Sequence, residues 1–261
     1  MIKAVLLDLD DTLLHVNDPV FVQEYLRLAD AFFESYWHHP VISRTLIDII
    51  RASSRPRDAQ QTNTSLAIDM LAAATGRSPT EISDSFALFY AEIYPALRQC
   101  VEPLPLAPLL LETTADNMHF VKPDPCYYAE IVARVGIEPD EAIMVGDHLT
   151  NDIIAAATTR LHTYHINSNT SPEVADGCGT LDDFFRAVVS ENWLERLHPR
   201  PLQKEAVEPQ LWGNIGALFG MLADVQPRFW SQHPDPDEWS IIQIVCHLLE
   251  SESQVQRPRL M

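Results

Sequence analysis

The chain has 261 residues, 46% of them hydrophobic, and a formal net charge of −19 at pH 7. This length allows one large or two small domains with a hydrophobic core. So acidic a balance argues against nucleic acid or an anionic membrane as the main partner, because both require a basic face. No stretch reaches the roughly eighteen apolar residues of a membrane span. The four scattered cysteines form no CxxC pair, which is typical of reduced thiols in a cytoplasmic protein.

The first residues, MIKAVLLDLDDT, place clustered acids directly after a strand. The apolar run Ile2–Leu7 is typical of a buried strand in a parallel sheet. Asp8, Asp10 and Asp11 follow it, and then Thr12. In open α/β sheets, ligands bind at the carboxyl ends of the strands. Closely spaced carboxylates repel one another unless a cation or a proton lies between them. A strand followed by an acidic turn or helix cap is the simpler alternative for this stretch alone.

A helical pattern follows from about Asp18 to Arg98. Apolar and aromatic residues recur there at three- and four-residue steps, which predicts an all-helical insert directly after the first strand. Gly76 is expected to end one of these helices, and the run Ser78–Glu81 to begin the next. We expect the aromatic residues of the insert to form its core rather than a ligand site.

The stretch after the insert is the least regular part of the pattern. Residues 100–119 include Pro103 and two further prolines, which exclude regular structure from their first half. A short strand is expected at Leu109–Leu111, and it leads into Thr113 and Thr114.

Strands and helices alternate in the region that follows. Asp124 has the features of a helix N-cap, Pro125 suits the first helical position, and Gly136 should end that helix. Buried strands are expected at Ala142–Val145 and Leu161–Ile166. This alternation predicts an α/β fold with a doubly wound parallel sheet.

The same patterns predict the domain organisation. The chain is expected to contain an α/β core, a helical insert, a polar and proline-bearing linker, and a helical tail with two helices. Their ranges are 1–14 with 101–197 for the core, 15–100 for the insert, 198–209 for the linker and 210–261 for the tail, with tail helices at about 210–225 and 240–256.

Five charged residues lie just past a strand or at the start of a helix, so one edge of one sheet can bring them together. They comprise four carboxylates and one lysine: Asp8, Asp10, Lys122, Asp147 and Asp152. Oxygen ligands in an incomplete protein cage suit Mg²⁺ completed by water and phosphate. The lysine would offset part of the remaining negative charge.

These motifs resemble those of the haloacid dehalogenase superfamily of hydrolases. The resemblance is carried by DLDDT at 8–12, KPDP at 122–125 and GDHLTND at 146–152, in that order, and by an insert in the position of a C1-type helical cap. It covers roughly residues 1–197. The resemblance implies a Rossmann-like sheet, a cap that closes over the site and selects the substrate, and a Mg²⁺-dependent reaction.

The resemblance also implies catalytic roles. Asp8 would be the nucleophile and would form an aspartyl-phosphate. Asp10 would be the general acid/base, first protonating the leaving oxygen and then activating water. Thr12 would orient the loop, and Lys122 would stabilise the nucleophile and the transferring phosphoryl group. Asp10 favours a phosphatase over a true dehalogenase, which has no leaving alkoxide to protonate.

The same resemblance predicts the ligands of the metal and of the substrate. Mg²⁺ would be held by Asp8, the backbone carbonyl of Asp10 and Asp147, and Asp152 would support the metal shell. Asp11 would contribute to substrate binding. The physical requirements agree, because phosphoryl transfer depends mainly on positioning and charge neutralisation.

The chain departs from the superfamily at its second motif, a strand that ends in a phosphate-binding Thr or Ser. Only residues 101–121 lie between the insert and Lys122, which leaves room for one strand but not for strand–helix–strand. Either the segment is deleted, or residues 109–112 lie beside the first strand and Thr113 or Thr114 supplies the hydroxyl. The LLLETT stretch also fits the strand that normally comes just before the lysine loop. If the second strand is missing, the first strand has an open edge.

The tail has a resemblance of its own. EWSIIQIVCHLLESE at 238–252 resembles the opening half of a DinB-like four-helix bundle, with His247 in the position of a metal ligand. An ordinary amphipathic helix with one exposed histidine is the alternative. A single histidine cannot hold a zinc or nickel ion that needs three or four ligands. We therefore expect a truncated module whose helices pack on the core, self-associate or stay loose.

The sequence thus favours a Mg²⁺-dependent phosphatase acting on a small phosphorylated metabolite. The alternative is a catalytically impaired domain of the same fold that acts as a binding or scaffold protein, because its second motif is missing.

Overall fold

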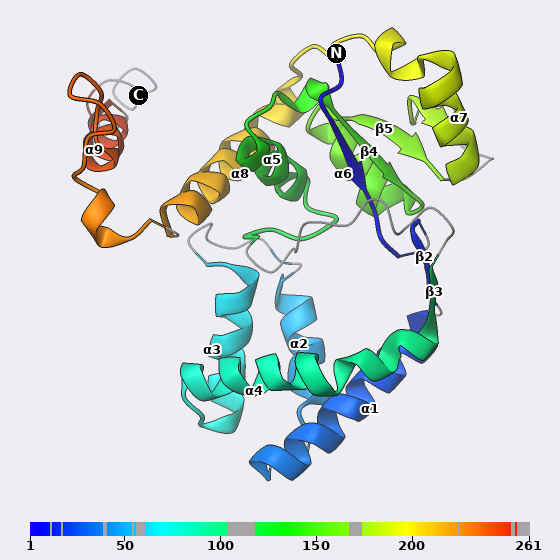
Figure 1. The fold of residues 1–261 in the computed structure, drawn as a ribbon, viewed down its shortest axis with the longest axis vertical. Coiled ribbons are helices and arrows are strands. Elements are labelled where there is room, and N and C mark those ends of the chain that lie inside the picture. Colours follow the sequence, from blue (N-terminus) through cyan, green and yellow to red (C-terminus); the bar gives the residue numbers. More distant parts are fainter. Residues whose placement is uncertain are drawn as a thin grey trace. The chain divides into compact units, whose positions relative to one another are not determined.

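The protein forms two compact units, Met1–Ala217 and Leu218–Met261 (Figure 1). No helix in the described part of the chain is long and apolar enough to cross a bilayer. The structure is a computed structural model, and it describes residues 1–10, 12–16, 18–38, 41–53, 55, 61–103, 118–166, 174–223, 225–251 and 254.

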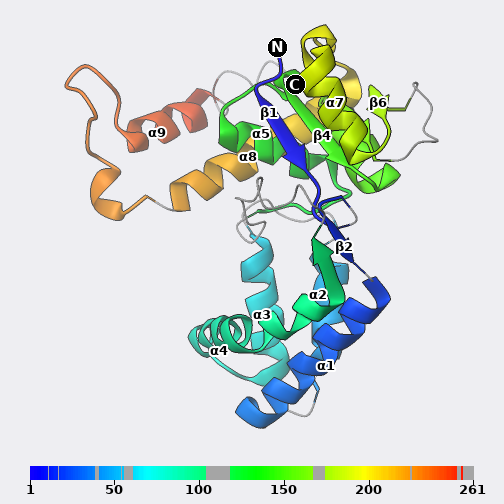
Figure 2. The same cartoon turned by 45° about the vertical axis from the view of Figure 1, so that its right-hand side comes forward.

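A parallel sheet forms the centre of the first unit. Its strand order is β1-β4-β5-β6, and each neighbouring pair is parallel. Leu7 of β1 pairs with Val145 of β4, so these two strands reach their carboxyl ends side by side (Figure 2). The strands span Ala4–Leu7 (β1), Ala142–Gly146 (β4), His162–His165 (β5) and Gly177–Cys178 (β6).

The two faces of the sheet carry different helices, as expected for a doubly wound fold. Ile143 and Val145 of β4 pack with α7 on one face, and Ala142 and Met144 pack with α5 and α6 on the other. Because neighbouring residues of a strand point to opposite faces, the apolar run of β4 serves both cores. The helices span Pro125–Val135 (α5), Ala155–Thr158 (α6) and Leu181–Glu191 (α7).

Helix α5 begins and ends where the sequence predicts. The Asp124 side chain accepts a hydrogen bond from the Cys126 N–H at 2.8 Å, and Pro125 occupies the first helical position. Gly136 ends the helix with a φ of 74°, a left-handed conformation that glycine adopts without strain. The Asp124 cap therefore fixes the start of α5 close to Lys122.

The helical insert is present and has its own core. Buried residues of α1 to α4 form one hydrophobic cluster, in which Phe33 and Phe89 are fully buried. Ser78 and Glu81 form the predicted reciprocal capping box at the start of α4. The helices span Asp18–Trp37 (α1), Ser43–Ser53 (α2), Asn63–Thr75 (α3) and Pro79–Glu92 (α4), and a 3₁₀ segment follows at Tyr94–Cys100.

A two-stranded ribbon at the ends of the insert corrects one prediction. Strands β2 (Leu14–Val16) and β3 (Val101–Pro103) pair antiparallel, and Leu14 lies opposite Pro103. The prolines after Cys100 do not exclude a strand here, because Pro103 is its last residue. A proline at the end of a strand in a two-stranded ribbon removes little of the ladder.

The first strand differs from its prediction in burial. Ile2–Leu7 was expected to be buried, whereas Val5 in β1 is 42% exposed. Among the described strands, β1 pairs only with β4, so it lies at the edge of the described sheet. The predicted strand Leu109–Leu111, together with Thr113 and Thr114, lies outside the described residues and stays a prediction.

Helix α8 (Lys204–Ala223) corrects the predicted linker. It begins within residues 198–209 and includes Pro209, and the boundary between the compact units falls inside it, after Ala217. A proline inside a helix costs a backbone hydrogen bond. Tertiary packing offsets this cost, because Gly213 lies directly against the backbone of α5. The division of the remaining chain into core and cap stays a prediction.

The second unit contains α9 (Ile241–Ser251), close to the predicted start at 240. Ser240 and Gln243 cap its first turn through reciprocal hydrogen bonds of 2.9 Å and 3.4 Å. Leu248 and Leu249 are at least half exposed. The predicted end at 256 lies outside the described residues.

We expect Gly213→Ala to lower the free energy of unfolding by about 1–3 kcal/mol. A Cβ at this position would meet the Glu130 backbone nitrogen at 2.6 Å, so α8 or α5 must shift. Chemical denaturation measures the change. Asn214→Ala, at an exposed position of the same helix, is the matched control and should not destabilise. Equal stability of both variants would contradict the close packing of α8 on α5.

Candidate active site

Asp8 is held at the end of β1 by the sheet itself. Its backbone N–H donates to the Val145 carbonyl at 2.9 Å and so continues the pairing with β4. The side chain is only 17% exposed. Burial raises the pKa of Asp8 above its ordinary value, and the attraction of Lys122 offsets this only in part. A nearby cation would therefore stabilise the ionised form of Asp8.

Asp147 and Asp152 come from the turn that follows β4. Asp152 lies in a π-helical segment, Leu149–Ile154, and is almost fully buried. Its Oδ2 accepts the His148 N–H at 3.1 Å. Gly146 allows this approach, because a Cβ there would lie 2.6 Å from the Asp152 Cβ. The GDHLTND motif therefore requires glycine at its first position for a steric reason.

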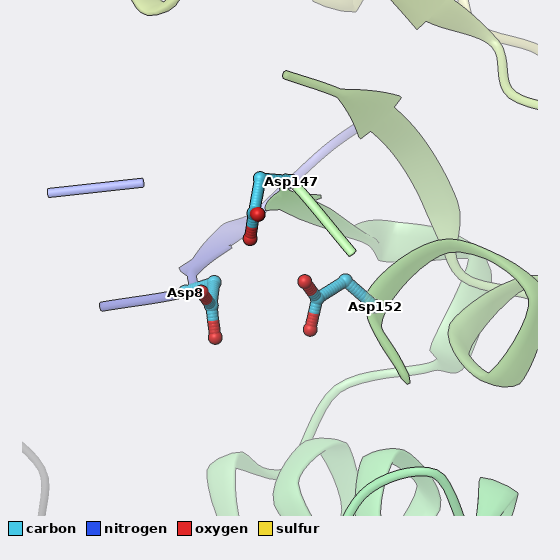
Figure 3. Close-up of side chains that lie close together, drawn as sticks. All are labelled: Asp8, Asp147 and Asp152. Atoms are coloured by element: carbon cyan, nitrogen blue, oxygen red, sulfur yellow. The ribbon is translucent and has the colours of Figure 1, made fainter. Parts of the chain in front are cut away.

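The three carboxylates converge at one place (Figure 3). One ligand atom from each of Asp8, Asp147 and Asp152 lies within 4.8 Å of the others. In an octahedral Mg²⁺ shell with bonds of about 2.1 Å, ligand oxygens lie about 3–4 Å apart. A small contraction of the cluster would therefore form such a shell, so these residues fit a hard divalent cation.

Lys122 joins two of these carboxylates. Its Nζ donates to Asp8 Oδ1 at 2.5 Å and to Asp152 Oδ1 at 2.7 Å. Burial alone would lower the pKa of Lys122, but the two aspartates together raise it above its ordinary value. The lysine is therefore charged. One positive charge against three carboxylates leaves a net negative site that attracts a cation.

Two residues that support the site were missed from the sequence. The Tyr128 hydroxyl in α5 donates to the Asn151 carbonyl at 2.7 Å and lies 3.3 Å from Asp152 Oδ1. His165 Nε2 donates to the Asp147 carbonyl at 2.6 Å. Tyr128 looked like part of an apolar helix face. The only signal for His165 was a histidine at the carboxyl end of a strand that was predicted to be buried.

The remaining predicted residues have different outcomes. Asp10 is exposed and its carboxylate is not part of the cluster of three, which leaves its predicted acid/base role and its backbone-carbonyl ligation as predictions. Thr12 is fully buried, and its hydroxyl has no hydrogen-bond partner among the described residues. Asp11, Thr113 and Thr114 lie outside the described residues.

The tail shows no comparable cluster within its described residues. His247 is exposed and packs edge-on against Trp239, with ring centroids 4.9 Å apart. This contact suits the alternative of an ordinary amphipathic helix. The resemblance to a DinB-like bundle and the self-association of the tail stay predictions.

Part of this site resembles a known protein family in its sequence. Residues 109–166, which carry Lys122, Asp147 and Asp152, match the family described as haloacid dehalogenase-like hydrolase. This stretch of the α/β core is similar in sequence to that family. None of the curated proteins matches the chain significantly.

Solved structures with the haloacid dehalogenase fold are similar to the chain. A 2-haloacid dehalogenase from Pseudomonas syringae pv. Tomato DC3000 is 20% identical, with a TM-score of 0.50, covering 74% of this chain and 100% of its own. A HAD phosphatase from Thermococcus onnurineus is 18% identical, with a TM-score of 0.42, covering 72% and 98%. A HAD family hydrolase from Deinococcus radiodurans R1, with bound phosphate and sodium, is 16% identical, with a TM-score of 0.33, covering 76% and 99%. At 20% identity, the similarity to the dehalogenase from Pseudomonas syringae supports the doubly wound fold and nothing about activity.

We expect Asp147→Asn to weaken Mg²⁺ binding roughly 10- to 100-fold, because it removes one charge from the cluster. Isothermal titration calorimetry with Mg²⁺, or electron paramagnetic resonance with Mn²⁺, measures the affinity. Asp84→Asn is the control: it removes one negative charge at an exposed position of α4, outside the cluster of three carboxylates. If both variants lose affinity equally, the ion is attracted only by the overall charge of the protein.

Proposed function

We propose that the chain is a Mg²⁺-dependent phosphatase of a small phosphorylated metabolite. The observation that carries this proposal is Lys122 bridging Asp8 and Asp152 beside Asp147. A carboxylate that could act as nucleophile, a fixed cation and three carboxylates suited to a divalent cation lie together, and this combination suits phosphoryl transfer through an aspartyl-phosphate. Mg²⁺, when bound, would neutralise charge on the phosphoryl oxygens.

Asp8 is assigned as the nucleophile. One of its carboxylate oxygens attacks phosphorus, the bond from phosphorus to the ester oxygen breaks, and an aspartyl-phosphate forms. Lys122 holds the attacking carboxylate in place and stabilises the negative charge of the transferring group. Water then attacks phosphorus, inorganic phosphate leaves, and the Asp8 carboxylate is restored.

Asp10 is assigned as the acid and base of the two steps. Its protonated carboxyl gives a proton to the departing ester oxygen, and the resulting carboxylate takes a proton from the attacking water. This role favours a phosphatase over a haloacid dehalogenase, because a leaving halide needs no proton. Asp10 is exposed, so its carboxyl group can exchange protons with water.

The helical insert is assigned the choice of substrate. The acidic balance of the chain argues against nucleic acid as a main partner. A second candidate function is supported by one observation. No described strand pairs with the outer side of β1, where the phosphate-binding hydroxyl of the second motif would be expected. The alternative is therefore a binding or scaffold domain with an impaired site.

Asp8→Asn should abolish hydrolysis of p-nitrophenyl phosphate with Mg²⁺, by about a thousandfold or more, because the amide is not a nucleophile. A colorimetric assay measures the release of p-nitrophenol, and circular dichroism confirms the fold. Asp84→Asn is the control with unchanged activity. A folded wild-type protein without turnover would favour the binding alternative, and chloride release from 2-chloropropionate would indicate a dehalogenase instead.

Asp10→Asn should affect substrates according to their leaving group. Hydrolysis of an alkyl phosphate such as glycerol phosphate should fall about a hundredfold or more, because an alkoxide needs a proton to leave. Hydrolysis of p-nitrophenyl phosphate should fall less, because p-nitrophenolate leaves unprotonated. Steady-state kcat/KM for both substrates measures the difference. Equal losses would argue against Asp10 as the acid.

A further inference from the structure

A second group of charges lies buried beside the site, and the proposed reaction does not use it. Glu130 in the second turn of α5 is fully buried, and His119 is 2% exposed. Glu130 Oε2 accepts the backbone N–H of His119 at 2.9 Å, and Oε1 lies 2.7 Å from His119 Nδ1. Burying a charge costs several kcal/mol unless it is paired and hydrogen-bonded. Such a pair therefore needs a physical explanation.

Arg134 completes the pairing of Glu130. Its Nε and Nη2 donate to Glu130 Oε1 at 3.0 Å and 2.6 Å from one helical turn further along α5. Burial alone would raise the pKa of Glu130, but the hydrogen bonds from His119 and Arg134 lower it below its ordinary value. Glu130 is therefore an ionised carboxylate, and Nδ1 of His119 carries the proton that lies between them.

Helix α8 closes this group from the outside. A Cβ on Gly216 would lie 3.1 Å from Glu130 Cδ and 3.2 Å from the Phe120 ring. Phe120 is itself buried, against Cys126 of α5. Water therefore has little access to the Glu130–His119 contact, and a hydrogen bond in such surroundings is strong and directional.

The segment that carries Lys122 is attached to α5 on both sides of the lysine. His119 ties it to Glu130, three residues before Lys122. Asp124 caps α5, and its N–H donates to the Val121 carbonyl at 2.9 Å. The lysine thus lies in a short span whose two ends are fixed to one helix.

The same helix also holds the partner of the lysine. Tyr128, two residues before Glu130, donates to the Asn151 carbonyl and lies within hydrogen-bonding distance of Asp152. Helix α5 therefore sets the position of Lys122 on one side and of Asp152 on the other. The Lys122–Asp152 distance depends on both attachments.

We propose that Glu130 and His119 are positioning residues for Lys122: their buried contact fixes the lysine-bearing segment to α5 and so keeps Nζ between Asp8 and Asp152. Neither residue touches the reacting atoms. The effect on turnover rests on the proposed phosphatase function, whereas the effect on the position of the lysine does not.

The lysine content of the chain allows a direct test. The chain has three lysines, Lys3, Lys122 and Lys204, so trace acetylation followed by mass spectrometry reports each amine separately. In the wild type, the ion pairs of Lys122 should suppress its labelling relative to the other two. If Lys122 leaves them, a fall of about one unit in its pKa alone gives about tenfold more reactive free amine.

The variants separate positioning from general stability. His119→Asn keeps a donor near the position of Nδ1, whereas His119→Gln places its amide near that of Nε2. We expect labelling of Lys122 to rise in His119→Gln and Glu130→Gln and to stay near the wild-type level in His119→Asn. Phe184→Leu, which destabilises the other face of the sheet, should leave Lys122 unchanged. If Glu130→Gln does not fold, the two His119 variants give the same comparison.

A kinetic measurement then connects position to turnover. In a protein that hydrolyses p-nitrophenyl phosphate, His119→Gln should lower kcat about tenfold or more with little change in KM, and His119→Asn should restore it. Unchanged labelling of Lys122 in folded His119→Gln and Glu130→Gln would overturn the proposal. A wild type without phosphatase activity would reject the proposed function but would leave the labelling result valid.

Discussion

Mutual repulsion of three carboxylates is the constraint on which the rest of this site depends. Asp8, Asp147 and Asp152 would not stay within 4.8 Å of one another on a flexible chain. Parallel pairing of β1 with β4 forces the first two together, and the buried turn after Gly146 adds the third. Lys122 offsets only part of the charge. The remaining negative charge is what a divalent cation would neutralise in the proposed chemistry.

Helix α5 fixes the positions of the charged residues relative to one another. It begins three residues after the lysine, contacts the Asp152 turn through Tyr128, and holds the preceding segment through Glu130. Helix α8 covers the same region through two glycines that allow its backbone to approach α5. The helix predicted to start a separate tail is thus part of the packing behind the site. Polar contacts and backbone packing act there together.

Much of the site could be predicted because its residues follow simple local rules. The carboxylates that follow Leu7 and Val145 lie close together because β1 and β4 are parallel neighbours. The residue types at Asp124 and Gly136 are typical of helix caps, so the ends of α5 could be predicted. Glu130 could not be recognised, because a glutamate in an amphipathic helix normally faces water and its partner lies in another segment. The start of α8 was predicted too late in the chain, because Pro209 is a local signal against a helix. In the structure the helix includes this proline.

The pairing of β2 with β3 has a consequence for how this protein could change over evolutionary time. Val16 and Val101 are paired, so the chain leaves for the helical insert and returns about one strand spacing, roughly 4.8 Å, away. Because the two ends of the insert lie this close together, a short turn could join β2 to β3 in its place. The insert can be enlarged, shortened or exchanged for another without altering the register of the parallel sheet. One contiguous block of sequence could therefore be replaced while the three carboxylates at the ends of β1 and β4 keep their positions.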